Sequence, residues 1–448
     1  MSWTSIDSRY RDVLIGAALG ISIALTSASA VTYISSRRSK SVNDTHEPEF
    51  SARPIELRSD EIVDGIAGVI ELGNTPLIRI NSLSNALGVE ILGKAEFLNP
   101  GGSVKDRVAL KIIDDAEQQG LLFPNTGSMI FEGTVGSTGI SIATVARARG
   151  YQTTIVMPDD VAAEKSLALE ALGARIEKVR PASIVDQKQN LAKQRALEFG
   201  RTQLQDSHDV AISTVTTKAS VEKGDSSTST AARGFFADQF ENLANYTAHL
   251  EGTGPEIWRQ TNGNVDAFVS GAGTGGTISG CSKYLKSVDP TVKVILADPE
   301  GSSLYNKVKF GVMYDKKERE GTKRRHQVDT VVEGIGINRL TQNFEMGMAL
   351  IDDAYRVTDA EAVAMSRYLV KNDGLFLGSS SACNLVACVR LAKDATAGFG
   401  RRSGKVIVTI LCDSGSRHYS KFWSDQYLAD AGIPIDLSII DSLLDKTS

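Results

Sequence analysis

The sequence is poor in cysteine and has no excess of positive charge. It contains 4 cysteines in 448 residues, and none of them forms a Cys-x-x-Cys pair: Cys281, Cys383, Cys388 and Cys412. This pattern argues against a disulfide scaffold and against a structural zinc site, so no metal is expected, and it is typical of a reducing compartment. The formal net charge of −5 argues against a protein that holds nucleic acid through its phosphates.

A long uncharged segment lies near the N-terminus, at residues 13–34. At about 1.5 Å per residue, a helix of this length reaches across the roughly 30 Å hydrocarbon core of a membrane. Two arginines precede the segment and three basic residues follow it. A buried core helix and a secretory signal cleaved near Ala28–Ala30 remain alternatives. A retained membrane anchor is the interpretation we adopt, because nothing downstream has the features of a secreted protein.

After this segment the pattern is that of an α/β protein. Apolar segments of strand length alternate with segments of helical period, which predicts mostly parallel sheets. The expected strands are 128–132, 153–157, 265–270, 292–298, 375–378 and 405–412, and the expected helices are 138–150, 164–173, 277–288 and 358–373.

Composition divides the chain into five parts. They are an N-terminal flank (1–12), the anchor (13–34), a polar linker (35–54), a catalytic domain (55–430) and a C-terminal tail (431–448). Two segments interrupt the α/β pattern of the domain, a Ser/Thr-rich stretch at 213–234 and a dense charge run at 315–327. Both are expected to be solvated surface insertions.

The stretch "NPGGSVKDR", residues 99–107, places Lys105 at the first turn of an expected amphipathic helix. The N-terminus of a helix carries partial positive charge, so a lysine there is either well hydrated or has a lowered pKa. A solvated surface lysine is the first alternative. A lysine with a lowered pKa can form a Schiff base or act as a base.

A glycine-rich loop, "SGAGTGGTISG" at 270–280, follows one expected strand and opens a helix. Backbone N–H groups at such a helix start can cradle a phosphate. Gly271, Gly273 and Gly276 match G-x-G-x-x-G, and Asp298 ends the next strand. These residues support a dinucleotide-binding Rossmann protein that takes NAD as one hypothesis.

The threonines of the same loop favour a different cofactor. The hydroxyls of Thr274 and Thr277 suit a terminal phosphate dianion better than a pyrophosphate diester. A phosphate monoester that also needs a lysine Schiff base would explain Lys105 and the loop together. Pyridoxal phosphate is such a cofactor.

Six motifs in one order carry a resemblance to a known family. They are "GNTPLIRI" (73–80), "NPGGSVKDR" (99–107), "TGPEIW" (253–258), "GAGTGGTISG" (271–280), "VEGIGI" (332–337) and "DSGSRHY" (413–419). Over residues 60–425 the chain resembles the cysteine synthase/cystathionine β-synthase family, the β-family of pyridoxal phosphate enzymes with fold type II. Within it, the chain is most similar to a fungal membrane-anchored cysteine synthase-like group.

The resemblance implies a fold, a reaction and a setting. The fold would be two three-layer α/β lobes with largely parallel sheets, with pyridoxal 5'-phosphate between them, in a homodimer. The reaction would be β-replacement on an activated serine, converting O-acetylserine and sulfide to cysteine and acetate. Cysteine desulfhydrase, serine/threonine dehydratase and a catalytically weak membrane-tethered binding protein remain alternatives. The setting would be the mitochondrial outer membrane, with the catalytic domain facing the cytosol.

The resemblance also implies residue roles. Lys105 would form the Schiff base, and Ser414 would hydrogen-bond the pyridine nitrogen. The cofactor phosphate would bind the loop formed by Gly273, Thr274, Gly275, Gly276 and Thr277. The substrate carboxylate would bind the loop formed by Thr134, Val135, Gly136, Ser137 and Thr138, with Ser137 also reaching the cofactor and Gln239 assisting.

Three positions depart from the family pattern. Val135 replaces a serine and Ser137 replaces an asparagine in the carboxylate loop, and Ala382 replaces a glycine in the stretch 378–383. Val135 has no side-chain donor, and Ser137 has a shorter reach than asparagine. Either the hold on the amino-acid donor is weakened, or neighbouring residues compensate for the change.

Overall fold

The structure is a computed structural model, and it describes residues 63, 65–180, 187–206, 232–315, 330–400 and 404–445. All of these residues belong to one compact unit. The expected flank, anchor and linker lie outside the described residues, as do most of the two expected insertions. Within the described ranges, no helix is long and apolar enough to cross a membrane.

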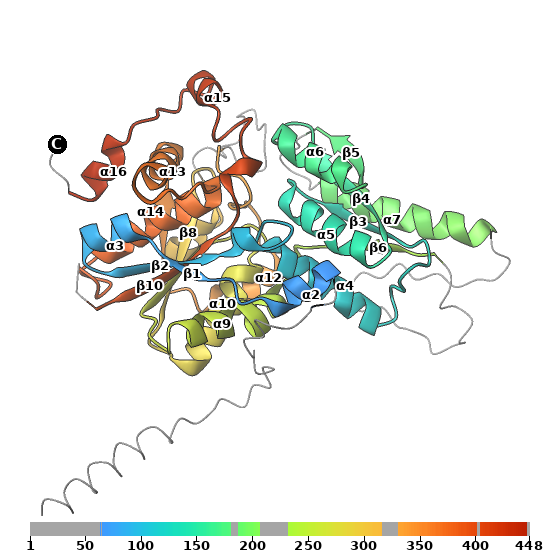
Figure 1. The fold of residues 1–448 in the computed structure, drawn as a ribbon, viewed down its shortest axis with the longest axis horizontal. Coiled ribbons are helices and arrows are strands. Elements are labelled where there is room, and N and C mark those ends of the chain that lie inside the picture. The colour runs from blue at the N-terminus through green and yellow to red at the C-terminus, as the bar shows by residue number, and fades with distance from the viewer. Residues whose placement is uncertain are drawn as a thin grey trace, which may run out of the picture. The chain divides into compact units, whose positions relative to one another are not determined.

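Two sheets form the centres of two lobes (Figure 1). The sheet of the large lobe has the order β1 (Leu77–Arg79), β2 (Glu90–Ala95), β10 (Val406–Leu411), β7 (Ala267–Gly271), β8 (Lys293–Pro299) and β9 (Asp353–Val357). The sheet of the small lobe has the order β5 (Arg175–Val179), β4 (Gln152–Pro158), β3 (Met129–Gly133) and β6 (Gly234–Phe236). Only the β1–β2 pair is antiparallel among these strands. The expected α/β fold with two lobes and largely parallel sheets is therefore confirmed.

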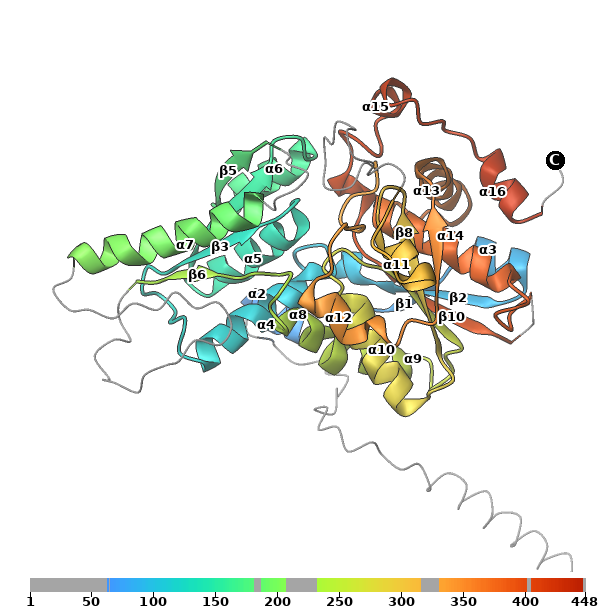
Figure 2. The ribbon, with the colours of Figure 1, turned by 180° about the vertical axis from the view of Figure 1, so that it is seen from behind.

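Helices cover both faces of each sheet (Figures 1 and 2). The small lobe carries α2 (Gly65–Leu72), α4 (Lys105–Gln118), α5 (Ser137–Ala148), α6 (Ala163–Ala171) and α7 (Gln187–Asp206). The large lobe carries α3 (Asn81–Leu87), α8 (Ala244–Ala248), α9 (Gly254–Gln260), α10 (Gly276–Val288), α11 (Leu304–Phe310), α12 (Gln342–Met348), α13 (Asp359–Asp373), α14 (Ser379–Lys393), α15 (Asp425–Asp430) and α16 (Ser438–Leu443).

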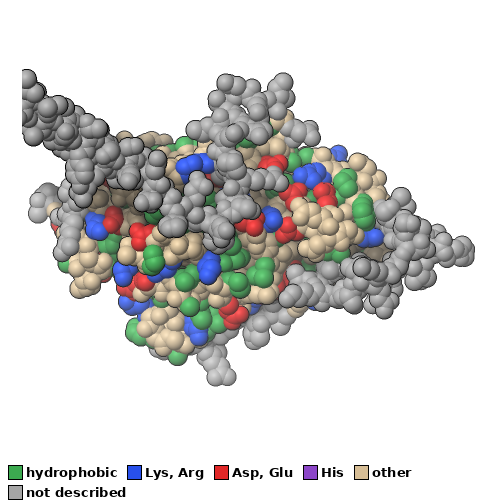
Figure 3. Space-filling view, turned by 90° about the horizontal axis from the view of Figure 1, so that it is seen from below, with side chains coloured by type: hydrophobic (Ala, Val, Ile, Leu, Met, Phe, Trp, Pro, Cys, Tyr) green, Lys and Arg blue, Asp and Glu red, His purple; other side chains and the backbone are tan. Residues whose placement is uncertain are grey.

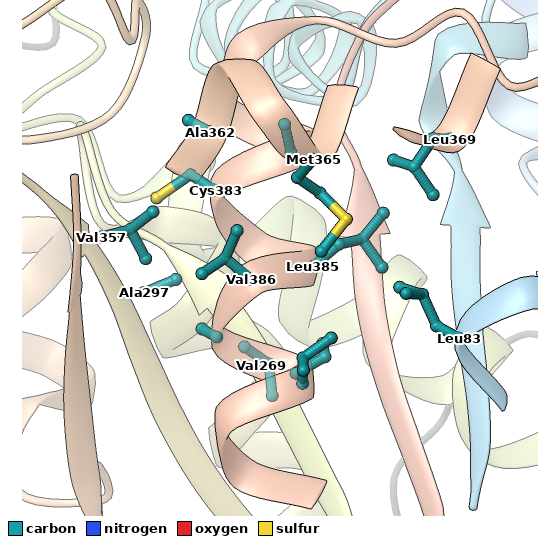
Figure 4. Close-up of a cluster of buried hydrophobic side chains, with 14 of the residues drawn as sticks. Leu83, Val269, Ala297, Val357, Ala362, Met365, Leu369, Cys383, Leu385 and Val386 are labelled. Atoms are coloured by element: carbon teal, nitrogen blue, oxygen red, sulfur yellow. The ribbon is translucent and has the colours of Figure 1, made fainter. Parts of the chain in front are cut away.

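Successive residues of the large-lobe strands point to opposite faces of the sheet, as the two-residue period of a strand requires. In β7, Ala267 and Val269 belong to one buried cluster and Phe268 to another. The first cluster surrounds α14, where Cys383 and Val386 face apolar side chains of α3, α13 and the sheet (Figure 4). Burying a side chain of this size contributes about 1.5–3 kcal/mol, so α14 is a main source of the lobe's stability.

One predicted strand is wrong. Residues 375–378 form only a single bridge, from Leu377 to Ser414. The reason is local: Gly374, with φ of 68°, ends α13, and Gly378 is the N-cap of α14. The few residues between these two helices leave no room for a strand.

The C-terminal segment packs against the large lobe. Ile440 of α16 and Leu444 are buried in the cluster that contains α13 and α14. On the face drawn in Figure 3, basic and acidic side chains are interspersed with hydrophobic ones.

Candidate active site

Two adjoining cavities lie at the carboxyl ends of parallel strands from both lobes, where α/β proteins bind ligands. The main cavity has a volume of about 590 Å³ and the inner cavity a volume of about 50 Å³. Lys105 and Ser137 line both cavities, as do Gly273 and Thr274 of the glycine-rich loop. The structure therefore brings together the lysine, the glycine-rich loop and the predicted carboxylate loop.

Lys105 is the first residue of α4, as the sequence predicts. The loop before it is fixed by hydrogen bonds: the Val104 N–H donates to the Cys412 carbonyl oxygen at 3.0 Å, and the Gly101 N–H donates to the Asp106 carboxylate. Burial lowers the pKa of Lys105, while Cys412 acts in the opposite direction. No ion pair joins the Lys105 ammonium to a carboxylate within the described part of the chain. A lysine in this setting is suited to react as a neutral amine.

The glycine-rich loop opens α10 and provides free backbone donors. Gly275 is the N-cap, with φ of 88°, and no side chain caps the helix. The N–H groups of the first turn have no partner within a helix, so they are available to an anion. A Cβ at Gly273 would lie 2.3 Å from the Gly334 carbonyl oxygen, and one at Gly276 would lie 2.1 Å from Asn245 Oδ1. Only glycine permits this close approach.

Side chains from α8 and the following helical turn orient the two threonines of the loop. Asn245 Nδ2 donates to Thr274 Oγ1 at 2.8 Å. Thr277 Oγ1 lies 3.1 Å from His249 Nε2, and His249 Nδ1 lies 2.9 Å from Thr253 Oγ1. Burial and the nearby Lys105 cation hold the pKa of His249 well below its ordinary value. A neutral imidazole donates through one nitrogen and accepts through the other, so this chain fixes the Thr277 hydroxyl.

The predicted carboxylate loop, residues 134–138, joins β3 to α5. The Gly136 N–H donates to Thr134 Oγ1 at 3.1 Å, and Thr138 Oγ1 donates to Gln239 Oε1 at 2.5 Å. Ser137 begins α5, whose N-cap Gly136 has no side-chain cap. Thr134, Val135, Ser137, Thr138 and Gln239 all line the main cavity.

A buried carboxylate behind this loop was missed by the sequence reasoning. Glu132 Oε1 accepts from Gln189 Nε2 at 2.7 Å and from Gln239 Nε2 at 3.2 Å. Burial raises the pKa of Glu132 to about 8. Glu132 thus fixes Gln239 against the loop. Its partner Gln189 comes from α7, so no local sequence signal connects the two.

Ser414 directly follows Asp413, which lines the inner cavity, although Ser414 itself lines neither cavity. Its hydroxyl oxygen accepts from the Ser416 N–H at 3.2 Å and caps a short helical turn, Gly415–Arg417. Its backbone forms the bridge to Leu377. The serines that line the inner cavity are Ser103, Ser137, Ser270 and Ser380.

Four charged or titratable side chains line the inner cavity, and a fifth, Lys421, lines the main cavity next to them. We call these five the Lys165 cluster: Lys165, Glu333, Asp413, His418 and Lys421. Lys165 of α6 forms an ion pair with Glu333 of the large lobe. His418 Nε2 lies 3.0 Å from Asp413 Oδ2, and Lys421 Nζ lies 3.5 Å from Glu333 Oε1. Glu333, Asp413 and His418 lie in the motifs 332–337 and 413–419, but no local signal connects them with Lys165 of α6.

Comparison with known proteins identifies the family. Residues 70–413 match the family model described as pyridoxal-phosphate dependent enzyme. The chain belongs to this enzyme family. It is 55% identical over 383 residues to "Cysteine synthase 2" of Emericella nidulans, covering 85% of this chain and 84% of that protein. It is 54% identical over 376 residues to "Cysteine synthase 2" of Schizosaccharomyces pombe, covering 84% of this chain and 87% of that protein.

A solved structure gives the same picture. The chain superposes on O-ureido-L-serine synthase with a TM-score of 0.64 and 27% sequence identity. The match covers 82% of this chain and 100% of that one.

The site fits pyridoxal phosphate and does not fit NAD. The glycine cradle at the start of α10 suits a phosphate dianion, and Lys105 supplies the amine for covalent attachment. The dinucleotide hypothesis needs an acidic side chain at the ribose, and Asp298 cannot serve. It is fully buried, accepts from the Tyr305 N–H at 2.7 Å, and lines neither cavity.

Proposed function

We propose that this enzyme makes cysteine by replacing the β-acetoxy group of O-acetylserine with sulfide, releasing acetate. The observation that carries the proposal is the meeting, in one cavity, of Lys105, the glycine cradle and the carboxylate loop. The relatives named cysteine synthase, which share more than half of their aligned residues with this chain, support the choice of reaction.

Each part of the cavity has a role in the proposed reaction. The N–H groups at the start of α5 bind the substrate carboxylate, and Gln239, fixed by Glu132, supports the loop. Pyridoxal phosphate, when bound, stabilises the negative charge that develops at the substrate α-carbon. The Lys105 amine removes the α-proton and later returns it at the same carbon, and its lowered pKa suits this exchange.

We keep Ser414 as the residue that contacts the pyridine nitrogen, as the family resemblance implies, and its neighbour Asp413 lines the inner cavity. A serine hydroxyl is neutral and leaves the nitrogen largely unprotonated. The ring is then a weaker electron sink than it would be beside an aspartate, which favours rapid loss of a β-leaving group.

Replacement of Lys105 tests the proposal most directly. Lys105→Ala should lower cysteine formation from O-acetylserine and sulfide by at least about 10²–10⁴-fold, the usual contribution of a positioned acid or base. Borohydride should fix pyridoxal phosphate to the wild type and not to the variant. Lys111→Ala, on the same helix, is the matched control and should keep both properties. Cysteine formation by Lys105→Ala at the wild-type rate would refute the assignment.

Product analysis separates the alternatives. Purified enzyme is supplied in turn with O-acetylserine plus sulfide, with serine, and with cysteine. Cysteine as the main product supports the proposal. Sulfide release from cysteine would identify a desulfhydrase, and a keto acid from serine would identify a dehydratase. Cofactor binding without turnover of any of the three would favour a binding protein.

We further propose that residues 13–34 anchor the enzyme in the mitochondrial outer membrane as a homodimer with the catalytic domain in the cytosol. The uncharged length of the segment and its basic flanks support the anchor. A Saccharomyces cerevisiae relative, 50% identical over 373 residues, has a name that assigns it provisionally to the mitochondrion. Deletion of residues 1–40 should release a soluble dimer that still binds cofactor, measured by carbonate extraction and light scattering. A mature N-terminus at Val31 in secreted protein would contradict the anchor.

A further inference from the structure

The carboxylate loop lacks a long polar side chain at Ser137. An asparagine there would place its amide donor one bond further from the backbone than the serine hydroxyl. Ser137 lines both cavities, so this shortfall lies inside the site. Another side chain would have to provide the N–H donor that an asparagine at position 137 would supply.

Lys165 is the side chain that reaches this place. It comes from α6 of the same lobe and lines the inner cavity together with Ser137. Its aliphatic stem packs against Gly136, where an added Cβ would lie 2.6 Å from Lys165 Cδ. Gly136 also has φ of 124°, a conformation that favours glycine. The backbone next to Ser137 is thus shaped around the lysine stem.

The Lys165 ammonium retains donors for a ligand. Its side chain is 2% exposed, and its ion pair is with Glu333 Oε2. An ammonium has three N–H donors, and one carboxylate oxygen commonly accepts one of them. A buried ion pair alone adds little stability, because desolvation offsets the attraction. The position of Lys165 at the inner cavity therefore indicates that its ammonium does more than join the two lobes.

Two carboxylates lie beside Lys165, and both have lowered pKa values. Burial alone would raise the pKa of Glu333, but the Lys165 cation and His418 hold it well below its ordinary value. The same holds for Asp413, whose pKa is lowered despite burial by His418 and by Lys165. Two ionised carboxylates thus accompany the lysine, and the cavity side is open to an anionic oxygen of a ligand.

We propose that Lys165 binds an anionic oxygen in the inner cavity, in the role of the longer side chain that Ser137 lacks. This inference rests on the proposed function for the identity of the ligands. The oxygen is either the oxygen substituent on the pyridine ring of the cofactor or an oxygen of the carboxylate of the amino-acid donor. Glu333 is the positioning residue that directs the ammonium.

A double-mutant cycle tests this. Four full-length enzymes are compared: wild type, Ser137→Asn, Lys165→Met, and the double variant. Lys165→Arg keeps the charge, and Lys178→Met removes an exposed lysine of the same lobe as a matched control. The readouts are the absorption spectrum and affinity of bound pyridoxal phosphate without donor. Spectral titration with O-acetylserine, serine and cysteine then gives dissociation constants that need no turnover.

Lys165→Met should weaken one of these affinities about 10- to 100-fold, the effect of losing one hydrogen bond to a charged group. Ser137→Asn alone provides the reference for the changed loop, and in the double variant it should recover most of the affinity that Lys165→Met loses. If Lys165→Met changes the cofactor spectrum and affinity before donor is added, the contact is with the oxygen substituent on the pyridine ring. An unchanged spectrum with weaker donor binding assigns it to the carboxylate.

Two results would overturn the proposal. One is Lys165→Met with cofactor and donor affinities within about twofold of wild type. The other is additive effects of the two substitutions together with a loss of stability in urea, because a purely structural lysine would not couple to Ser137. Failure of the proposed function is a separate result, since an enzyme that makes no cysteine still gives the cofactor and donor titrations.

Discussion

Two clusters of charged side chains differ in how completely their charges are satisfied. The first, which we call the Arg107 cluster, consists of Arg107, Lys94, Glu96 and Glu256. Arg107 donates to Glu96 Oε2 at 2.8 Å and to Glu256 Oε1 at 2.7 Å, and Lys94 lies 2.6 Å from Glu256 Oε2. All four residues are buried, and none of them lines either cavity.

The Lys165 cluster is less completely buried and less completely paired, since Glu333 and Lys421 are partly exposed. Asp413 Oδ1 has no hydrogen-bond partner among the described residues, and His418 Nδ1 lies 3.6 Å from Glu333 Oε2, just beyond hydrogen-bond distance. Glu333 and Lys165 line the inner cavity, and their ion pair joins the two lobes. Buried polar groups without partners are rare in native proteins, and those that occur often serve a ligand. We infer that the fully paired Arg107 cluster stabilises the fold, whereas the incompletely paired Lys165 cluster serves the ligand site.

Four of the six motifs of the family resemblance contribute residues to these clusters. Segments 99–107 and 253–258 contribute Arg107 and Glu256 to the first cluster. Segments 332–337 and 413–419 contribute Glu333, Asp413 and His418 to the second. Arg107 of α4 and Glu256 of α9 come from different lobes, so both clusters join the lobes, and only the second one lines the inner cavity.

The largest expected effect is on stability, at Arg107. Arg107→Met leaves two buried carboxylates without their main partner, which should cost about 3–5 kcal/mol of unfolding free energy. Arg195→Met removes an exposed pair with two glutamates and should cost no more than about 1 kcal/mol. Urea unfolding of both variants measures the difference. The spectrum of bound pyridoxal phosphate should be unchanged in folded Arg107→Met, and a shifted spectrum would break the distinction between the clusters.

A smaller effect on stability, with an effect on the site, is expected at Glu333. Glu333→Gln keeps the shape but weakens the contact to Lys165, which should cost about 1–3 kcal/mol. In contrast to Arg107→Met, it should also change the donor affinity measured by spectral titration. Glu177→Gln, at an exposed ion pair, is the control for the loss of one charge. Unchanged donor affinity in Glu333→Gln would show that this cluster, too, is only structural.

The smallest expected effect is a pH dependence from His418. Burial would lower the pKa of His418, but Asp413 raises it, with a net rise above the ordinary value. Its contribution to stability is therefore fully present below about pH 6.5, the unfolded value, and is lost as the pH rises through the higher folded pKa. The difference in unfolding free energy between wild type and His418→Gln should shrink over that interval. A difference that grows with pH would contradict this assignment.

Much of the fold could be predicted because its signals are local. Segments such as 153–157 and 277–288 carry the periods of a strand and a helix, and the structure places β4 and α10 there. The error at 375–378 arose from the apolar sequence Leu375–Leu377, which matches a strand in composition. Gly374 ends α13 and Gly378 begins α14, so the residues between them are too few to form a strand despite their apolar composition.

The site was predictable only in its loops. Lys105 and the loop 273–277 lie within continuous motifs, and the structure brings them together in the inner cavity. Asn245, His249 and Lys165 act across the fold, through contacts to residues distant in sequence. Ser414 follows Asp413 at the edge of the inner cavity, and its role at the pyridine nitrogen stays a prediction.

The position of β10 at the centre of the large-lobe sheet has a consequence for synthesis on the ribosome. β10 pairs with β2 on one side and β7 on the other, with Val406 opposite Glu90. The four strands of the small lobe, β3 to β6, all precede β7 in the chain and can assemble early. Until β10 is available, the large-lobe sheet consists of two parts, β1–β2 and β7–β8–β9, and the facing edges of β2 and β7 are unpaired. Such edges are sites of aggregation. Translation of residues 406–411 is thus the step that closes the sheet and ends the nascent chain's need for protection by chaperones.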